Sequence, residues 1–306
     1  MAQNEVGEVF LIKTSDRAVG IESLLDQFDM DEYSGKNVAL KANYNSADPF
    51  PASTHPDTLE ALVRGLKDAG ASDLVLAERS GMGDTRTVLK QVGVFDLSER
   101  LGFRIVVLDE IDKEDWVKIE KDETHWIRGF YISKAFLEAD KVVQTCCLKT
   151  HRFGGHFTLS LKNSVGLIAK RVPRGLYDYM GELHVSPHQR LMIAEINKFY
   201  KVDLVVMDAI EAFLNKGPDK GDLAEPNLML ASRDRVAIDA VGVAILRSFG
   251  STENVMRDRI FELDQIRRAA EINVGVKSAS DIELIPLDGE SRKSAKTIAD
   301  ILETQG

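Results

Sequence analysis

The segment from Lys141 to Tyr177 contains seven lysines and arginines and no aspartate or glutamate, in a chain whose formal net charge is −10. Two of the six histidines, His151 and His156, lie within it. Clustered cations concentrate ligands of the opposite charge. We therefore predict that this segment binds an anionic small molecule, a carboxylate or a phosphate, through residues that include Lys149 and Arg152. The alternative is that these cations pair with surface carboxylates elsewhere in the fold.

The run from His151 to His156 contains Gly154-Gly155 and indicates a glycine loop that enters a helix over residues 159–167. Free N–H groups at the start of a helix hold anions readily. Lys162 and Asn163 would lie in that helix among apolar residues. Burial would lower the pKa of Lys162 and suit it to a nucleophilic or covalent role. Equally, its stem could cover apolar surface while its ammonium reaches water.

His184 is the third candidate for chemistry, as an acid or base near Lys162 or as a metal ligand. Its i, i+4 spacing to His188 is that of a helical zinc pair, but Ser186-Pro187 predicts a helix start between the two. His156 is the second candidate metal ligand, and the metal would be nickel or iron. The sequence leaves the identity of any cofactor open.

Other cofactor sites are not indicated. The two cysteines, Cys146 and Cys147, are adjacent and lack the spacing of an iron–sulfur or zinc site. The glycine motif at Ser80–Asp84 does not follow the first predicted strand, so no NAD fingerprint is recognised.

Polar residues also follow several predicted strands. Lys41 and Asn43 come after the second strand, and Asp208 ends the sixth. Asp239 lies among apolar residues of a predicted helix, where a carboxylate requires a partner. We expect all four to contribute to ligand binding; for Asp208 and Asp239 a purely structural role is the alternative.

The elements that position these residues follow an alternating pattern of short β-branched runs and longer helical segments. Such a pattern predicts an α/β fold with a mainly parallel, doubly wound sheet and helices on both faces. Ligands bind outside the carboxyl ends of the strands in such folds. The strands are predicted at 9–13, 38–41, 74–78, 105–108, 141–147, 204–208, 228–231 and 282–287, and the helices at 57–69, 85–101, 187–200 and 233–249.

Length and composition favour one large domain over residues 1–306. Its core would extend over about 38–250, and a helical, highly charged region would follow at about 251–306. The negative net charge opposes binding to nucleic acid or an anionic membrane. No apolar run approaches the length of a membrane span. The expected location is the cytoplasm.

Four groups of residues occur in a characteristic order. They are Leu148-Lys-Thr-His151, Leu161-Lys-Asn163 with Gly166, Val206-Met-Asp208 with Gly217-Pro218 and Gly221, and Ala231-Ser-Arg-Asp-Arg-Val-Ala-Ile-Asp239-Ala. In this order they resemble the domain-of-unknown-function family 362, from about Val38 to about Gly250. That family has no settled biochemical role. Some of its members carry a ferredoxin-like module with cysteine quartets, which implies redox protein partners; this chain lacks those cysteines.

More distantly, the order His151-Arg, Gly-Gly, Lys162, Gly166 and His184 is similar to the nickel-pincer lactate racemase family. The resemblance implies that His151 is an acid/base, that Lys162 carries the pincer nucleotide, and that His184 binds nickel. The second acid/base histidine of that family, expected after the third strand, is replaced here by Glu78-Arg79-Ser80.

These observations support three functional hypotheses. The preferred one is a protein that binds an anionic small molecule at the strand ends, with a metal or cofactor as an open question. The second is a non-catalytic cofactor-binding or assembly protein for redox enzymes. The third is a racemase or epimerase of 2-hydroxy acids that uses a nickel-pincer cofactor. The oligomeric state is not indicated.

Overall fold

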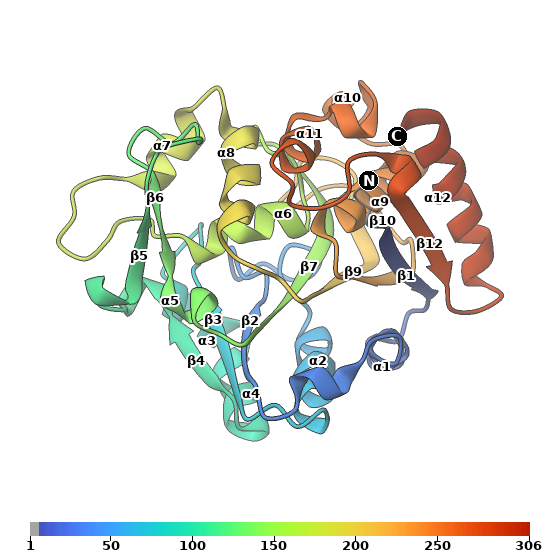
Figure 1. The fold of residues 1–306 in the computed structure, drawn as a ribbon. Helices are drawn as coiled ribbons and strands as arrows, with labels where there is room; N and C mark the ends of the chain where they lie inside the picture. The colour runs from blue at the N-terminus through green and yellow to red at the C-terminus, as the bar shows by residue number, and fades with distance from the viewer. Residues whose placement is uncertain (1–5) are drawn as a thin grey trace, which may run out of the picture.

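The computed structural model describes residues 6–306, so residues 1–5 of the predicted domain lie outside it. The fold is built around one ten-stranded sheet (Figure 1). Within the described part of the chain, β11 is the strand of the main path that runs antiparallel to its neighbours. The predicted mainly parallel sheet is therefore confirmed. In spatial order the main path comprises β12 (Ile282–Pro286), β1 (Gly7–Lys13), β11 (Leu228–Ser232), β9 (Leu204–Phe213), β7 (Lys141–His151), β2 (Asn37–Lys41), β3 (Asp73–Glu78) and β4 (Arg104–Val107).

Two of these strands are longer than predicted because each continues into an antiparallel partner. β7 extends to His151 by pairing with β8 (His156–Thr158), and β9 extends to Phe213 by pairing with β10 (Leu223–Ala224). A second sheet of two strands, β5 (Trp116–Ile119) and β6 (Phe130–Ser133), lies beside the main one.

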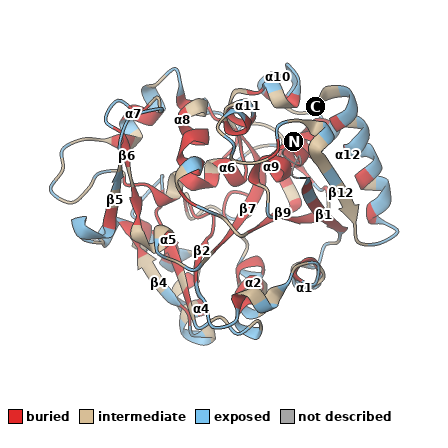
Figure 2. Ribbon diagram, viewed as in Figure 1, coloured by how far each residue is buried: buried red, intermediate tan, exposed pale blue. Residues whose placement is uncertain are grey.

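Helices cover both faces of the main sheet, as predicted (Figure 1). One apolar core forms between the sheet and the first group of helices, and another forms between the sheet and the second group. The buried residues are concentrated in the strands and in α9, whereas α1 and α12 keep an exposed face (Figure 2). The first group is α1 (Arg17–Leu25), α2 (Pro56–Asp68), α3 (Thr85–Gln91) and α4 (Val94–Leu101); the second includes α6 (Ser160–Asn163), α8 (Gln189–Ile196), α9 (Arg235–Ser248), α11 (Asp264–Glu271) and α12 (Ser291–Gln305).

Two local predictions differ from the structure. The helix expected over 85–101 is divided into α3 and α4, because Gly93 adopts a left-handed conformation with φ of 75°. The glycine loop expected to enter a helix at 159–167 is instead the turn of the β7–β8 hairpin, in which His151 faces His156. The helix that follows is short: α6 spans only Ser160–Asn163 and continues as a 3₁₀ turn, Ser164–Leu167.

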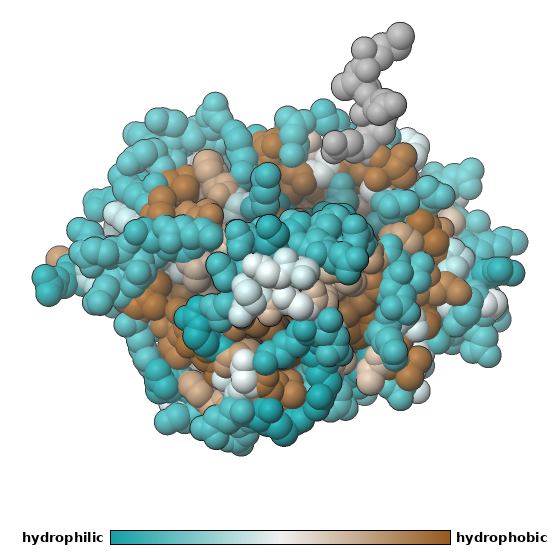
Figure 3. Space-filling model, turned by 60° about the horizontal axis from the view of Figure 1, so that its bottom comes forward, coloured by the Kyte–Doolittle hydropathy of each residue, from teal (hydrophilic) through white to brown (hydrophobic). Residues whose placement is uncertain are grey.

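The C-terminal region is helical as predicted, with α10 (Glu253–Met256), α11 and α12. It also contributes β12, which adds to the edge of the main sheet beside β1. No helix within residues 6–306 is both long and apolar enough to span a bilayer. On the face shown in Figure 3, hydrophilic side chains predominate, and apolar ones are visible between them.

Candidate functional site

A pocket with a volume of about 850 Å³ lies at the carboxyl ends of β2, β3 and β7. The chain places β3 and β4 on one side of β2 and then returns to place β7 and β9 on the other side. The strand order therefore reverses between β2 and β7. In open α/β sheets such a reversal leaves a crevice in which ligands bind. Residues of α6 and of α7 (Tyr179–Val185) complete the walls.

The structure brings most of the predicted site residues together in this pocket. Seven of them line it: Lys41, Asn43, Lys149, His151, Lys162, Asn163 and His184. They come from two strands, two helices and the loop after β2, so the fold gathers residues that are as much as 143 positions apart. The other four, Arg152, His156, Asp208 and Asp239, are not among its lining residues.

Lys162 presents an ammonium group to the pocket without a protein partner. It makes no hydrogen bond or ion pair with any residue in the described range 6–306. Burial lowers the pKa of Lys162 to about 8, and the positive charges of Lys149 and Arg79 contribute to the same shift. The lysine is therefore a cation at neutral pH that becomes a free amine in mildly alkaline solution.

The two histidines that line the pocket are held in opposite tautomers. The Nδ1 atom of His151 accepts a hydrogen bond from the Gly155 N–H at 3.3 Å, so the proton of the neutral ring lies on Nε2. The Nδ1 of His184 lies 2.7 Å from the Met180 carbonyl, which can only accept, so in the neutral ring Nδ1 carries the proton and the lone pair lies on Nε2. Nε2 of His151 is thus arranged to donate a hydrogen bond and Nε2 of neutral His184 to accept one.

Burial and nearby positive charges, of which those of Lys162 and His184 have the largest effect, depress the pKa of His151 far below its ordinary value. The ring is therefore neutral throughout the physiological range. Gly155 permits the His151 ring to lie close to Lys162. A Cβ atom at position 155 would lie 2.8 Å from His151 Nδ1 and 2.8 Å from Lys162 Cε. No larger residue fits between the two side chains without displacing one of them.

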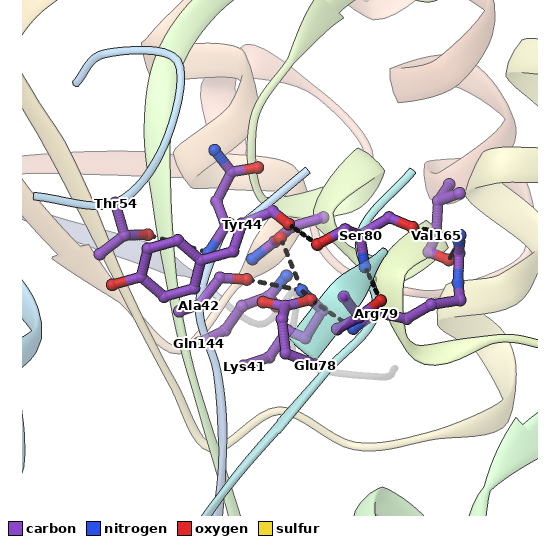
Figure 4. A network of polar contacts seen from close by, with 12 residues as sticks. Lys41, Ala42, Tyr44, Thr54, Glu78, Arg79, Ser80, Gln144 and Val165 are labelled. Carbon is purple, nitrogen blue, oxygen red and sulfur yellow. Dashed lines mark hydrogen bonds and ion pairs between the residues drawn. The ribbon is translucent and has the colours of Figure 1, made fainter. Parts of the chain in front are cut away.

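A buried ion pair forms the floor of the pocket (Figure 4). Lys41 Nζ lies 2.5 Å from Glu78 Oε1, and both side chains are almost completely buried. The Asn163 side chain accepts from Lys41 at 3.3 Å and donates to the Thr145 carbonyl at 3.0 Å, so α6 is connected to β2 and β7. Burial lowers the pKa of the Lys41 ammonium and raises the pKa of the Glu78 carboxyl, while the ion pair opposes both shifts.

Lys149 and Asn43 fasten the loop that follows β2. The β7–β9 pairing shifts register between Cys147 and Lys149, and such a bulge changes the direction of a side chain. Lys149 Nζ donates to the Pro51 carbonyl at 3.2 Å and to the Ala52 carbonyl. The Asn43 amide also donates to the Ala52 carbonyl. Burial lowers the pKa of Lys149, which meets carbonyl oxygens but no carboxylate.

The pocket has an excess of positive charge. Six of its lining residues are lysines or arginines and three are carboxylates. Each carboxylate has a lining cation as its partner: Glu78 pairs with Lys41, Asp109 with Lys170 and Asp178 with Arg171. The remaining cations, Arg79, Lys149 and Lys162, have no carboxylate within ion-pair distance in the described residues. An anionic ligand would supply the missing counter-charge.

Residues 38–244 match the family described as Domain of unknown function (DUF362). This chain belongs to that family. The family description assigns no activity, and this agrees with the first of the two sequence resemblances. Every pocket-lining residue, from Lys41 to Pro218, falls within the matched stretch.

Two individual proteins are similar to this DUF362 chain. The thylakoid-associated protein sll1697 of Synechocystis sp. is 26% identical over 194 residues, which are 63% of this chain and 57% of that protein. A cytoplasmic location of the present chain stays a prediction. The lactate racemase apoprotein from Thermoanaerobacterium thermosaccharolyticum matches in structure with a TM-score of 0.47 and 16% identity, over 73% of this chain and 54% of its own. Lactate racemase is also the enzyme named in the more distant sequence resemblance. A structural likeness at this level assigns no role to any residue of this chain.

Two predicted carboxylates of the DUF362 chain make structural contacts and do not line the pocket. Asp239, on α9, accepts hydrogen bonds from the Ser160 N–H at 2.8 Å and the Leu161 N–H at 3.1 Å, and so caps α6. Asp208 accepts from Arg17 at 2.8 Å and from Thr58 at 2.6 Å, and so joins β9 to α1 and α2.

Arg152 and His156 lie in the β7–β8 hairpin but away from the pocket lining. Arg152 pairs with Asp219 and thereby fastens the loop at 215–222. Burial, with the charges of Arg190 and Arg257, lowers the pKa of His156 to about 4. No group of three His, Cys, Asp or Glu in residues 6–306 is arranged to hold a metal ion.

Glu78 and Arg79 are the main site residues that the sequence prediction omitted. Both are buried and line the pocket. Their signal is visible in the sequence, because they directly follow a buried strand, as Lys41 does after β2. The ordering of strands that places β3 next to β2 was needed to recognise it.

Proposed function

We propose that this DUF362 protein is an enzyme that binds a small anionic substrate at Lys162, removes a proton from it with His184, and stabilises the charge that develops with a hydrogen bond from His151. The unpartnered ammonium of Lys162, in a pocket with excess positive charge, carries this proposal. The anion of the substrate would be a carboxylate or a phosphate, since either accepts the N–H groups of an ammonium.

The opposite tautomers of the two histidines support the catalytic part of the proposal. A general base needs a free lone pair, which Nε2 of His184 offers. The Nε2–H of neutral His151 can donate a hydrogen bond to negative charge that develops on the substrate. Both rings line the same pocket as Lys162. A substrate whose anion lies on Lys162 would share the pocket with both rings.

Binding is tested first, by thermal shift with acetate, butyrate, malate, phosphate and glycerol phosphate. We expect at least one of these anions to stabilise the natural protein, and the Lys162→Gln variant to lose that stabilisation. Lys198→Gln is the matched control, because Lys198 pairs with Glu123 at the surface and its replacement removes the same charge. Equal shifts for Lys162→Gln and the natural protein would refute the assignment of the anion site.

Catalysis is tested by incubating each bound acid with the protein in D₂O and following deuterium incorporation by NMR. We expect incorporation with the natural protein and its loss in His184→Gln and in His151→Asn. Binding without any exchange or conversion would instead favour the non-catalytic cofactor-binding role.

The residues that the nickel-pincer resemblance singles out fit a covalently held group. The amine of Lys162 and Nε2 of His184 are both without partners in the described residues and line one pocket. A pincer nucleotide on Lys162 would supply a nickel-bound acceptor for hydride. His184 would be the residue that binds the metal of that group, through Nε2. An added mass on protein purified from its own host, absent in Lys162→Ala, tests this attachment.

A further inference from the structure

Buried polar atoms without partners gather at the pocket. Within residues 6–306, the side chains that contain such atoms and line the pocket are Tyr44, Glu78, Arg79 and Thr158. Nearly all buried polar atoms in folded proteins have hydrogen-bond partners. Several exceptions at one pocket therefore point to groups that a ligand satisfies.

Glu78 is the acidic member of this group, and the geometry around Lys41 indicates its charge. Lys41 Nζ lies within hydrogen-bond distance of three acceptors: the Ala42 carbonyl at 2.6 Å, Glu78 Oε1 at 2.5 Å and Asn163 Oδ1 at 3.3 Å. An ammonium has three N–H donors and no lone pair, so three acceptors match its protonated form. Glu78 is accordingly the carboxylate partner of this cation.

The two carboxylate oxygens of Glu78 differ in their environment. Oε1 accepts from Lys41 and, at 2.9 Å, from the Arg79 N–H. Oε2 is fully buried and accepts from no donor in the described residues. Figure 4 shows the Glu78 and Lys41 side chains directed toward one another. The pair thus fixes the carboxylate in place with one acceptor unused.

We propose that Glu78 Oε2 accepts a hydrogen bond from a hydroxyl group of the ligand, so that the ligand is a small acid carrying a hydroxyl apart from its anionic group. This inference rests on the proposed function in placing the anion at Lys162. The anion itself cannot occupy the Glu78 end, because two like charges would repel each other. A ligand ammonium is disfavoured by the excess of cations in the pocket. A neutral hydroxyl donor satisfies both conditions.

The test uses titration calorimetry with butyrate, 2-, 3- and 4-hydroxybutyrate, and the methyl ether of each hydroxy acid. A methyl ether keeps the oxygen but has no O–H to donate. We expect one of the hydroxybutyrates to bind about ten- to a hundredfold more tightly than its ether and than butyrate, the range for a hydrogen bond to a charged group. Equal affinities of hydroxy acids and ethers would overturn the proposal.

Variants separate this proposal from the binding role of Lys162. Glu78→Gln should abolish the preference for each hydroxy acid over its methyl ether, whereas Lys162→Gln should weaken all acids together. Because Glu78→Gln leaves Lys41 without a counter-ion, the double variant Lys41→Met/Glu78→Gln serves as the second measurement. A hydroxyl preference that survives in both variants would refute the role of Glu78 while leaving the anion site intact. Failure of the natural protein to bind any of the acids would refute both.

Discussion

The lowered pKa of Lys162 predicts how anion binding depends on pH. The anion needs the ammonium form, so affinity is fully present below the pKa of about 8 and decreases as pH rises through it. Between pH 7 and pH 10 the charged fraction of a group with this pKa falls by about 90-fold, whereas that of an ordinary lysine falls by only about 1.4-fold. The structural cause is burial of Lys162 beside the positive charges of Lys149 and Arg79.

The assay is calorimetric titration of butyrate, which does not titrate in this range, at half-unit steps from pH 7 to pH 10. Two variants control the experiment. Lys162→Arg keeps its charge and should give a flat profile wherever it still binds. Lys149→Met removes one neighbouring cation and should move the midpoint above 8. A decline that persists in Lys162→Arg, or a midpoint near 10.5 in the natural protein, would refute the reasoning.

Three further predictions concern stability and are checked by urea unfolding. Gly166→Ala should destabilise the fold by about 3 kcal/mol, because the new Cβ would lie 2.7 Å from Lys41 Nζ and 3.1 Å from Glu78 Oε1 and would disturb a buried ion pair; an unchanged midpoint would contradict the close approach. Asp239→Ala should cost about 2–4 kcal/mol, because it leaves two buried N–H groups of α6 without their acceptor; a loss below 1 kcal/mol would show that water replaces the carboxylate. The pKa of His151 is far lower in the folded than in the unfolded protein. As pH falls below 6.5 only the unfolded chain takes up this proton, so the free energy of unfolding decreases. From pH 7.5 to pH 5.5 the natural protein should therefore lose about 1.4 kcal/mol more than His151→Asn, and parallel losses would refute a buried neutral ring.

Much of the fold was predictable because its signals are local. Apolar runs such as that ending at Asp208 indicate strands covered on both faces, and their alternation with helices fixes the class of sheet. The extension of β7 was not predictable in the same way, because the Gly154-Gly155 pair suits both a helix entry and a hairpin turn. The pairing of His151 with His156 decides between these, and it depends on where β8 can find a partner.

The candidate site was predictable to the extent that it consists of polar residues after strands. Lys41, Lys149 and Lys162 were recognised by residue type and position, and all three line the pocket. The sequence could not show that Asp239 is used by α6, since its two N–H partners lie 78 and 79 positions away. It also could not show which strand neighbours β2, and for that reason the role of Glu78 became visible only in three dimensions.

The hydrogen bond from Lys41 to Asn163 joins residues 122 positions apart and has a consequence for local opening of the protein. It connects β2, a strand from the early part of the chain, to α6. Helix α6 packs against α9 on the face of the sheet opposite to α1–α4. Amide protons of the two segments should therefore exchange with solvent in one cooperative unit, at a common free energy of opening. A ligand that bridges Lys162 and Glu78 would slow exchange in both segments together. A ligand in the pocket would then stabilise β2 and α6 together against local unfolding.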